Sequence, residues 1–155
     1  MLGKTYGGQY CSIARSLDLV GERWSLLILR EAVLSGVTRY SDFQHNLGIA
    51  TNVLKARLDG FLGAGLMVRN DRGDYEPTQM GRDFYPALLA LAEWGDKWSA
   101  PDGPPGIFRH VECGQRVHIE IHCPEHHRIA ADEISVVPGP GAPPEWVESR
   151  RPVRA

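Results

Sequence analysis

The chain of 155 residues lacks several features that mark whole classes of protein. It has no run of about 18 apolar residues, so its sequence supports no transmembrane helix. The first residues, MLGKTYGGQYC, contain one lysine and no apolar stretch, which is not the pattern of a secretory signal. Three cysteines are few and odd in number, which argues against a disulfide framework. A reducing cytoplasm is therefore the expected location.

Catalytic motifs and strong charge are missing as well. No Gly-rich phosphate loop and no nucleophile motif is present, so we expect no enzyme. The formal net charge of −2 does not indicate a nucleic-acid partner, but DNA meets only one face of a protein. The positions of the basic residues therefore matter more than their sum. A hydrophobic content of 43% and a charged content of 23% are typical of a soluble globular protein.

Apolar residues at helical spacing predict four helices in the first 65 residues. The first begins near residue 10 and ends at Gly21, and the second ends at Gly36. The third is short, with Ser41 as its expected N-cap, and is followed by a turn at Gly48. The fourth covers ATNVLKARLDGFLGAG, which has one apolar face and one polar face.

Beyond residue 65 the pattern changes to two short strands, LMVRN and DYEPT. The Asp-Arg-Gly sequence at residues 71–73 between them favours a tight hairpin. A long helix is predicted from Thr78 to Trp98, and Pro86 is expected to kink it. Because apolar residues lie on almost every side of this helix, we expect it to bury a second face against a partner chain.

The last third of the chain differs in composition. APDGPPG, at residues 100–106, is typical of a linker. QRVHIEIHC alternates apolar and polar residues and predicts one strand, and ADEISVVPGPG predicts a second. We therefore expect a winged-helix and dimerisation domain over 1–99, a small β-rich accessory module over 107–141, and a flexible, Pro-rich tail over 142–155.

The helices and the hairpin occur in the order of a winged helix-turn-helix. The major groove of B-DNA admits one α-helix, and the preceding helix fixes its angle. Candidate DNA contacts are Arg39, Thr51, Asn52, Lys55, Arg57 and Arg72. Thr and Asn can bond to base edges, Lys and Arg can reach guanine or phosphate, and a hairpin tip can meet the minor groove. Alternatively, the basic residues only solvate a helix face, so the hypothesis depends on the ordered set of elements.

Three ordered stretches, CSIARSLDLVGERWSLLILREAV, TRYSDFQHNLGIATNVLKARLDGFLGAGLMVR and YEPTQMGRDFYPALLALAEW, resemble the HxlR-type regulators, winged-helix relatives of the MarR group. The resemblance covers about three-fifths of the chain. It implies a mainly α fold with a small β component, and a long helix that pairs two subunits. It also implies a homodimeric transcriptional regulator, expected to be a repressor, that binds a pseudo-palindromic operator in double-stranded DNA.

Two positions depart from the pattern of that family. The wing of this chain is short and has the sequence NDRGDYEP, whereas the family often has a longer wing with proline. Few contacts between the wing and DNA are therefore expected. The family usually begins its recognition helix with Ile-Ser, and here the pair is Ile49-Ala50. Capping must then come from Thr51 or be lost.

Cys11 lies where some regulators that resemble this chain have a thiol sensor at the start of the first helix. A helix N-terminus lowers the pKa of a thiol and so favours the reactive thiolate. The alternative is that Cys11 is a small buried hydrophobe. A small apolar effector between the long helix and the first helices is a further possibility for the signal.

The stretch HVECGQRVHIEIHCPEHH holds two of the three cysteines and five of the six histidines. It has the form H-x2-C…C-x2-H, and the four candidate zinc ligands are His110, Cys113, Cys123 and His126. Only nine residues separate the two halves, and the extra histidines make such spacing easy to find by chance. The alternative is a metal-free β-hairpin appendage, in which no cofactor is required.

Two other functions remain open from the sequence alone. A small metal-dependent enzyme would use the Cys/His cluster with Glu120 or Glu125 as its general base. A dimeric interaction module would keep the winged-helix shell without binding DNA. We expect the DNA-binding regulator, because nothing in the sequence places the carboxylates in a cleft.

Overall fold

The computed structural model describes residues 5–149 of the chain. The protein divides into two compact units, one formed by residues 19–119 and the other by residues 5–18 together with residues 120–149. The linker expected at residues 100–106 lies within the first of these units. Within residues 5–149, no helix is long and apolar enough to cross a membrane.

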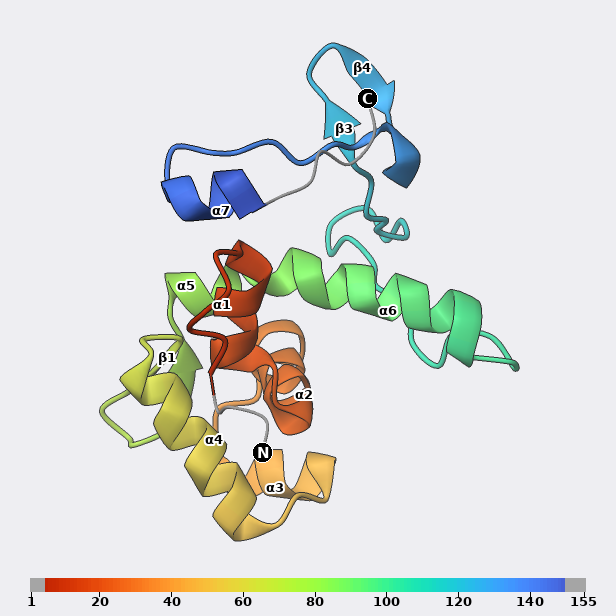
Figure 1. Ribbon diagram of the computed structural model, residues 1–155. Coiled ribbons are helices and arrows are strands. Elements are labelled where there is room, and N and C mark those ends of the chain that lie inside the picture. The colour runs from red at the N-terminus through yellow and green to blue at the C-terminus, as the bar shows by residue number, and fades with distance from the viewer. Residues whose placement is uncertain (1–4, 150–155) are drawn as a thin grey trace. The chain divides into compact units, whose positions relative to one another are not determined.

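The helical part begins with α1 (Ser12–Val20), α2 (Arg23–Leu34), α3 (Tyr40–Leu47) and α4 (Thr51–Gly63), as the apolar spacing predicts (Figure 1). The core of this part is built by side chains with almost no exposed surface. They come from α2, α3 and α4 and are Ile28, Leu29, Phe43, Leu54, Leu58 and Phe61. Because α4 packs its apolar stripe into this core, its opposite face remains exposed.

Glycine ends α3 as expected, but the expected N-cap of this helix is wrong. Gly48 follows α3 in the left-handed conformation with φ of 60°, where its N–H donates to the Gln44 carbonyl oxygen. Arg39, not Ser41, is the residue before the first turn of α3, and no side chain caps that turn. Ser41 lies inside the helix, where its hydroxyl bonds to Asp42.

The hairpin consists of β1 (Met67–Arg69) and β2 (Tyr75–Pro77), which pair antiparallel with Arg69 opposite Tyr75. At its tip the Asn70 side chain accepts hydrogen bonds from the backbone of Arg72 and Asp74, both at 3.0 Å. The N–H of Tyr75 donates to the Thr38 carbonyl oxygen at 2.8 Å. The segment before α3 thus adds a backbone contact to the hairpin, which fixes the hairpin beside the helices.

The single long helix that we expected after Thr78 is two helices, α5 (Gln79–Arg82) and α6 (Tyr85–Ser99). Pro86 lies in the first turn of α6, where its missing N–H costs no helical bond, so it starts a helix instead of kinking one. The Thr78 side chain caps α5 by accepting from the N–H of Gly81. A Cβ at Gly81 would lie 2.3 Å from the Leu66 carbonyl oxygen, so glycine is required there.

Of the strands predicted in the last third of the chain, only the end of the first, QRVHIEIHC, is a strand, and the second is wrong. The strands found are β3 (His122–Cys123) and β4 (His126–Arg128), which pair with each other around a tight turn. The predicted second strand holds only the 3-10 turn η1 (Ala131–Glu133), and α7 (Pro144–Ser149) lies in the segment that we expected to be loosely ordered. Alternation is a weak guide here because burial is slight. Val117 and Ile119 are only half-buried, Ile121 is 53% exposed and Val136 is 72% exposed.

Candidate DNA-binding interface

The outer face of α4 is the part of the winged helix that is best suited to enter a groove. Asn52, Lys55 and Asp59 are exposed on it, away from the buried residues of the same helix, and Thr51 is exposed at its edge in the first turn. Ala56 is exposed beside them, and its small side chain leaves room for DNA to approach the helix closely. The face therefore offers a hydroxyl, an amide and an ammonium group within the first turns of the helix, which are the groups that read base edges.

The start of α4 carries no side-chain cap, so Thr51 does not cap the helix and capping is lost. Ala50 is the residue before the first turn, and its carbonyl oxygen accepts the N–H of Leu54 at 2.9 Å. Tyr40 of α3 donates its hydroxyl to the Thr51 carbonyl oxygen at 2.8 Å. This bond connects the two helices of the helix-turn-helix. Sequence reasoning missed it because no local motif predicts it.

Lys55 forms an ion pair with Asp59, one turn along the same exposed face. The hydrogen bond and the charge of Asp59 raise the pKa of Lys55, so the lysine stays charged. One of the three ammonium donors of Lys55 is taken by Asp59, which leaves two for a phosphate or a base. Asp59 therefore lowers the net positive charge of the reading face, and it weakens non-specific attraction to DNA.

Arg57 lies on a different side of α4 from Lys55, because two residues advance a helix by about 200°. Its guanidinium is 4.0 Å from the Glu22 carboxylate, just before α2. The structure therefore does not place Arg57 beside Asn52 and Lys55. Arg39, the residue before α3, is exposed.

The wing carries two arginines with different surroundings. Arg72 is exposed at the tip, and among the described residues its guanidinium has no hydrogen-bond or ion-pair partner. Arg69, which sequence reasoning missed, donates to the Gly73 carbonyl oxygen and to the Tyr75 hydroxyl, and its guanidinium lies over the Tyr75 ring at 4.3 Å. Arg69 thus holds the hairpin together, whereas Arg72 is the wing cation available to DNA.

Acidic side chains surround that available cation. Asp71, Asp74 and Glu76 line a hollow of about 380 Å³ at the wing together with Arg72. Three carboxylates beside two arginines make the wing a poor general binder of phosphate. The contact expected from the wing is therefore a single one, through Arg72.

The angle between α2 and α3 is supported by Glu31, a charged residue that is only 7% exposed. Its carboxylate pairs with Arg30 at 2.7 Å and accepts a hydrogen bond from Asn46 of α3 at 3.0 Å. Both carboxylate oxygens are thus bonded, which a buried charge requires. The helix that precedes the reading helix is held in place through this contact.

Comparison with known proteins identifies the winged helix. The family model of the HxlR-like helix-turn-helix matches residues 19–102, which is more than half of the chain. The chain belongs to the HxlR family. A Mycobacterium tuberculosis protein named as an HTH-type transcriptional regulator is 41% identical over 140 residues, which cover 84% of this chain and 87% of the relative. A Synechocystis protein named in the same way is 32% identical over 59% of this chain and 72% of its own length.

Solved structures agree with this assignment to the HxlR family. PA1607, described as a candidate transcription factor, aligns with a TM-score of 0.76 and 35% identity over 83% of this chain and 94% of its own. PA1374 of Pseudomonas aeruginosa, described likewise, aligns with a TM-score of 0.62 and 34% identity, over 89% of this chain and 99% of its own. Quinone-bound YodB of Bacillus subtilis, at 21% identity and a TM-score of 0.51, shares the fold over 57% of this chain. The chain is thus a transcriptional regulator with a DNA-binding winged helix-turn-helix.

Cys11, the candidate sensor in this HxlR protein, directly precedes α1 and is half-buried. Its carbonyl oxygen accepts the N–H of Arg15 at 3.1 Å, which is the first bond of the helix. The residue therefore occupies the helix-start position that the sensor hypothesis requires. Its reactivity stays a prediction.

Two of the four candidate zinc ligands come together. The Nδ1 atom of His110 lies 3.3 Å from the Sγ atom of Cys113, in a loop closed by hydrogen bonds between the backbone of His110 and residues 114 and 115. Cys123 belongs to the other compact unit, and the side chain of His126 lies outside the described residues. Among the side chains that are described, no three possible ligands gather, so zinc binding stays a prediction.

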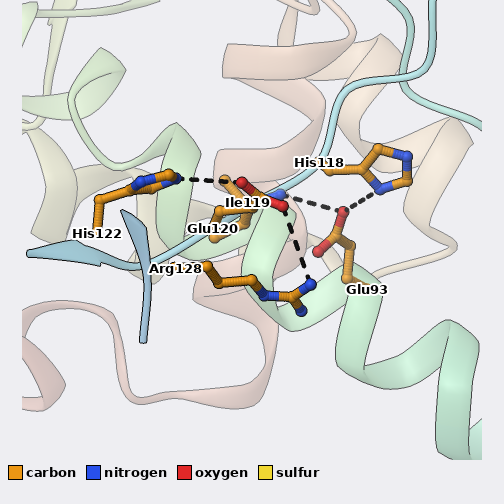
Figure 2. Close-up of polar contacts among 6 residues, drawn as sticks. All are labelled: Glu93, His118, Ile119, Glu120, His122 and Arg128. Carbon is orange, nitrogen blue, oxygen red and sulfur yellow. Dashed lines mark hydrogen bonds and ion pairs between the residues drawn. The ribbon is translucent and has the colours of Figure 1, made fainter. Parts of the chain in front are cut away.

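A carboxylate on α6 holds the segment that leads to the second unit. Figure 2 shows Glu93 facing this segment, where its Oε1 atom accepts the N–H of Ile119 at 3.2 Å and lies 3.2 Å from His118 Nδ1. One turn further along α6, Asp96 pairs with Arg116 at 3.8 Å. Residues 116–119 are thus attached to α6 by polar contacts. In the second unit, the Glu120 carboxylate lies 3.1 Å from His122 Nε2. Among the described residues, neither Glu120 nor Glu125 belongs to a group of three possible metal ligands.

Proposed function

We propose that the protein is a repressor that binds a pseudo-palindromic operator as a homodimer. The observation that carries this proposal is the exposed face of α4, where Thr51, Asn52 and Lys55 follow one another from the first turn. Arg72 at the wing tip adds a phosphate contact beside the groove, and Arg39 before α3 adds another. The two reading helices of a dimer would enter successive major grooves about 34 Å apart.

The dimer is supported by an apolar stripe on α6. Leu91, Trp94 and Trp98 recur three and four residues apart and are 50%, 59% and 67% exposed. A helix that leaves two tryptophans uncovered is typical of an interface, and the spacing of three and four suits a second copy of the same helix. Trp94→Ala should therefore shift the protein from dimer to monomer in sedimentation experiments, whereas a dimer that persists unchanged would place the interface elsewhere.

Operator binding is tested by gel shift with DNA from the region upstream of the protein's own gene. We expect a dimer complex that weakens steeply with salt, because phosphate contacts release counterions. Asn52→Ala should relax base preference by about 1–3 kcal/mol at one position of each half-site. Arg72→Ala should weaken binding to all sequences alike. Absence of salt-sensitive binding to any genomic fragment would leave a DNA-free interaction module and would refute the proposal.

Arg57→Ala provides a matched comparison for Arg72→Ala. Both changes remove one positive charge, but Arg57 faces Glu22 and Arg72 is unpaired among the described residues. If the Asn52 and Lys55 face enters the groove, Arg57→Ala should reduce affinity less than Arg72→Ala does. An equal or larger loss would mean that Arg57 contacts DNA, as the sequence predicts, and that α4 is rotated in the groove.

The signal that releases the operator is proposed to act through Cys11 or through a small ligand. Cys11 directly precedes α1, which is the position that the sensor hypothesis requires. YodB, which shares the fold, has been solved with quinone bound. Cys11→Ser should abolish release of the operator by peroxide or quinone, and unchanged release would exclude Cys11 as the sensor.

Zinc at His110, Cys113, Cys123 and His126 is the remaining proposal from the sequence. It is supported by the short distance between His110 and Cys113. Elemental analysis of the purified protein decides between zinc and the metal-free hairpin: about one equivalent of zinc would establish the metal, and less than about a tenth of an equivalent would exclude it.

A further inference from the structure

A cavity of about 220 Å³ lies in the compact unit that contains both the N-terminal segment and the last helix. Tyr10, Cys11 and Arg15 line one side of it, and Gly139, Gly141 and Trp146 line the other. The Tyr10 hydroxyl donates to the Glu145 carboxylate of α7 at 3.1 Å, which ties the two segments together. The cavity is therefore open to solvent on part of its surface, and it is lined by segments that lie more than 120 residues apart in sequence.

The residues that line this cavity include one positively charged side chain, Arg15, and no negatively charged one. Among the described residues the Arg15 guanidinium has no hydrogen-bond or ion-pair partner. The two nearby carboxylates are already engaged, since Asp18 accepts the N–H of Tyr6 at 2.8 Å and Glu145 accepts the Tyr10 hydroxyl. Neither carboxylate lines the cavity. An arginine with no partner at the edge of a cavity favours a planar anion, because its fork of N–H groups matches a carboxylate.

The walls of the cavity favour a single flat ring. Tyr10 and Trp146 contribute aromatic surfaces from its two sides. Gly139 and Gly141 contribute no side chain, and a Cβ added at either would have no atom within 4 Å, so they leave open space. A volume of about 220 Å³ is below the range of about 300–1,000 Å³ that is typical of sites for drug-sized ligands. The occupant is therefore small.

We propose that this cavity binds a small aromatic carboxylate, with Arg15 bonded to the carboxylate and the ring packed against Tyr10 and Trp146. The residues that line the cavity and the residues of α4 belong to different compact units. The occupant of the cavity would reach the start of α1, the helix that begins beside Cys11, so it offers a way for a metabolite to act on the regulator. Binding is measured without DNA, so failure of this proposal and failure of operator binding are distinguishable.

The probe is benzoate, with benzyl alcohol as its neutral counterpart of similar size, titrated into the full-length protein by calorimetry or ligand-observed NMR. The wild-type protein should bind benzoate at least about tenfold more tightly than benzyl alcohol, because the charged hydrogen bonds to Arg15 are worth about 1.5 kcal/mol or more. Arg15→Gln should bring the two affinities within about twofold. Arg82→Gln, which removes an exposed arginine on α5, should leave the preference unchanged.

A second measurement needs no variant. Benzoate should slow alkylation of Cys11, which lines the cavity, and leave alkylation of the exposed Cys113 unchanged, as mass spectrometry of the same sample can resolve. The proposal is overturned if wild-type protein does not prefer benzoate, if Arg15→Gln retains the preference, or if Cys11 and Cys113 are protected equally.

Discussion

The winged helix and the region after residue 100 are stabilised in different ways. Up to residue 89 the chain supplies every buried apolar side chain of the described residues, among them Phe43, Leu54 and Phe61. From residue 100 to residue 149 no described side chain is buried, and Val111 is 97% exposed. Packing therefore determines the first region, whereas turns and single hydrogen bonds determine the second. A DNA-reading helix needs the rigidity that only the first arrangement provides.

The largest difference is expected when a buried leucine is truncated. Leu54 has no exposed surface and anchors α4 in the core. Leu54→Ala should lower the free energy of unfolding by about 3 kcal/mol, through lost burial and a cavity. Val111→Ala is the matched change in the exposed region and should stay within about 0.5 kcal/mol. Urea denaturation of both variants checks the pair, and similar losses would contradict the contrast between the two regions.

Two glycine substitutions should give opposite signs within the winged helix. Gly81→Ala places a Cβ 2.3 Å from the Leu66 carbonyl oxygen, so it should destabilise the fold by about 2 kcal/mol. Gly60→Ala, in the middle of α4, meets no atom within 4 Å and should stabilise the protein by about 0.5–1 kcal/mol, because alanine favours a helix. Thermal unfolding compares them. A stabilising Gly81→Ala would show that α5 does not approach the hairpin so closely.

The same contrast explains what the sequence could predict. Each helix of the winged helix buries one face, so apolar spacing located α1 to α4, and the apolar face predicted for α4 is the one that buries Leu54, Leu58 and Phe61. Alternation in QRVHIEIHC reflects only the partial burial of Val117 and Ile119, so it predicted a strand that is absent from 117–121. The pattern of the sequence carries information about structure only where burial makes use of it.

Particular side-chain contacts and helix boundaries could not be predicted from the sequence for another reason. The Tyr40 bond to Thr51, the Arg69 stack on Tyr75 and the break before α6 depend on tertiary geometry. Of the candidate DNA contacts, Thr51, Asn52 and Lys55 share one side of the helix because, at about 100° per residue, they fall within an arc of about 100°. Arg57 was assigned to that face by residue type, and helical geometry places it on another side.

The smallest expected effect is local and lies where the two regions meet. Glu93→Ala removes the acceptor of the Ile119 N–H and the partner of His118, both exposed or half-buried, so global stability should hardly change. Opening of residues 116–119 should become about fivefold to tenfold more frequent, since one net hydrogen bond is worth about 1 kcal/mol. Hydrogen exchange of the Ile119 amide measures this, with Glu112→Ala, an exposed carboxylate in the same region, as the control. Glu93→Gln should recover part of the protection, because an amide oxygen still accepts the N–H. If exchange at Ile119 is equally fast in the wild-type protein, the segment is not held by Glu93, and the ordered part of the chain ends with the packed core of the winged helix.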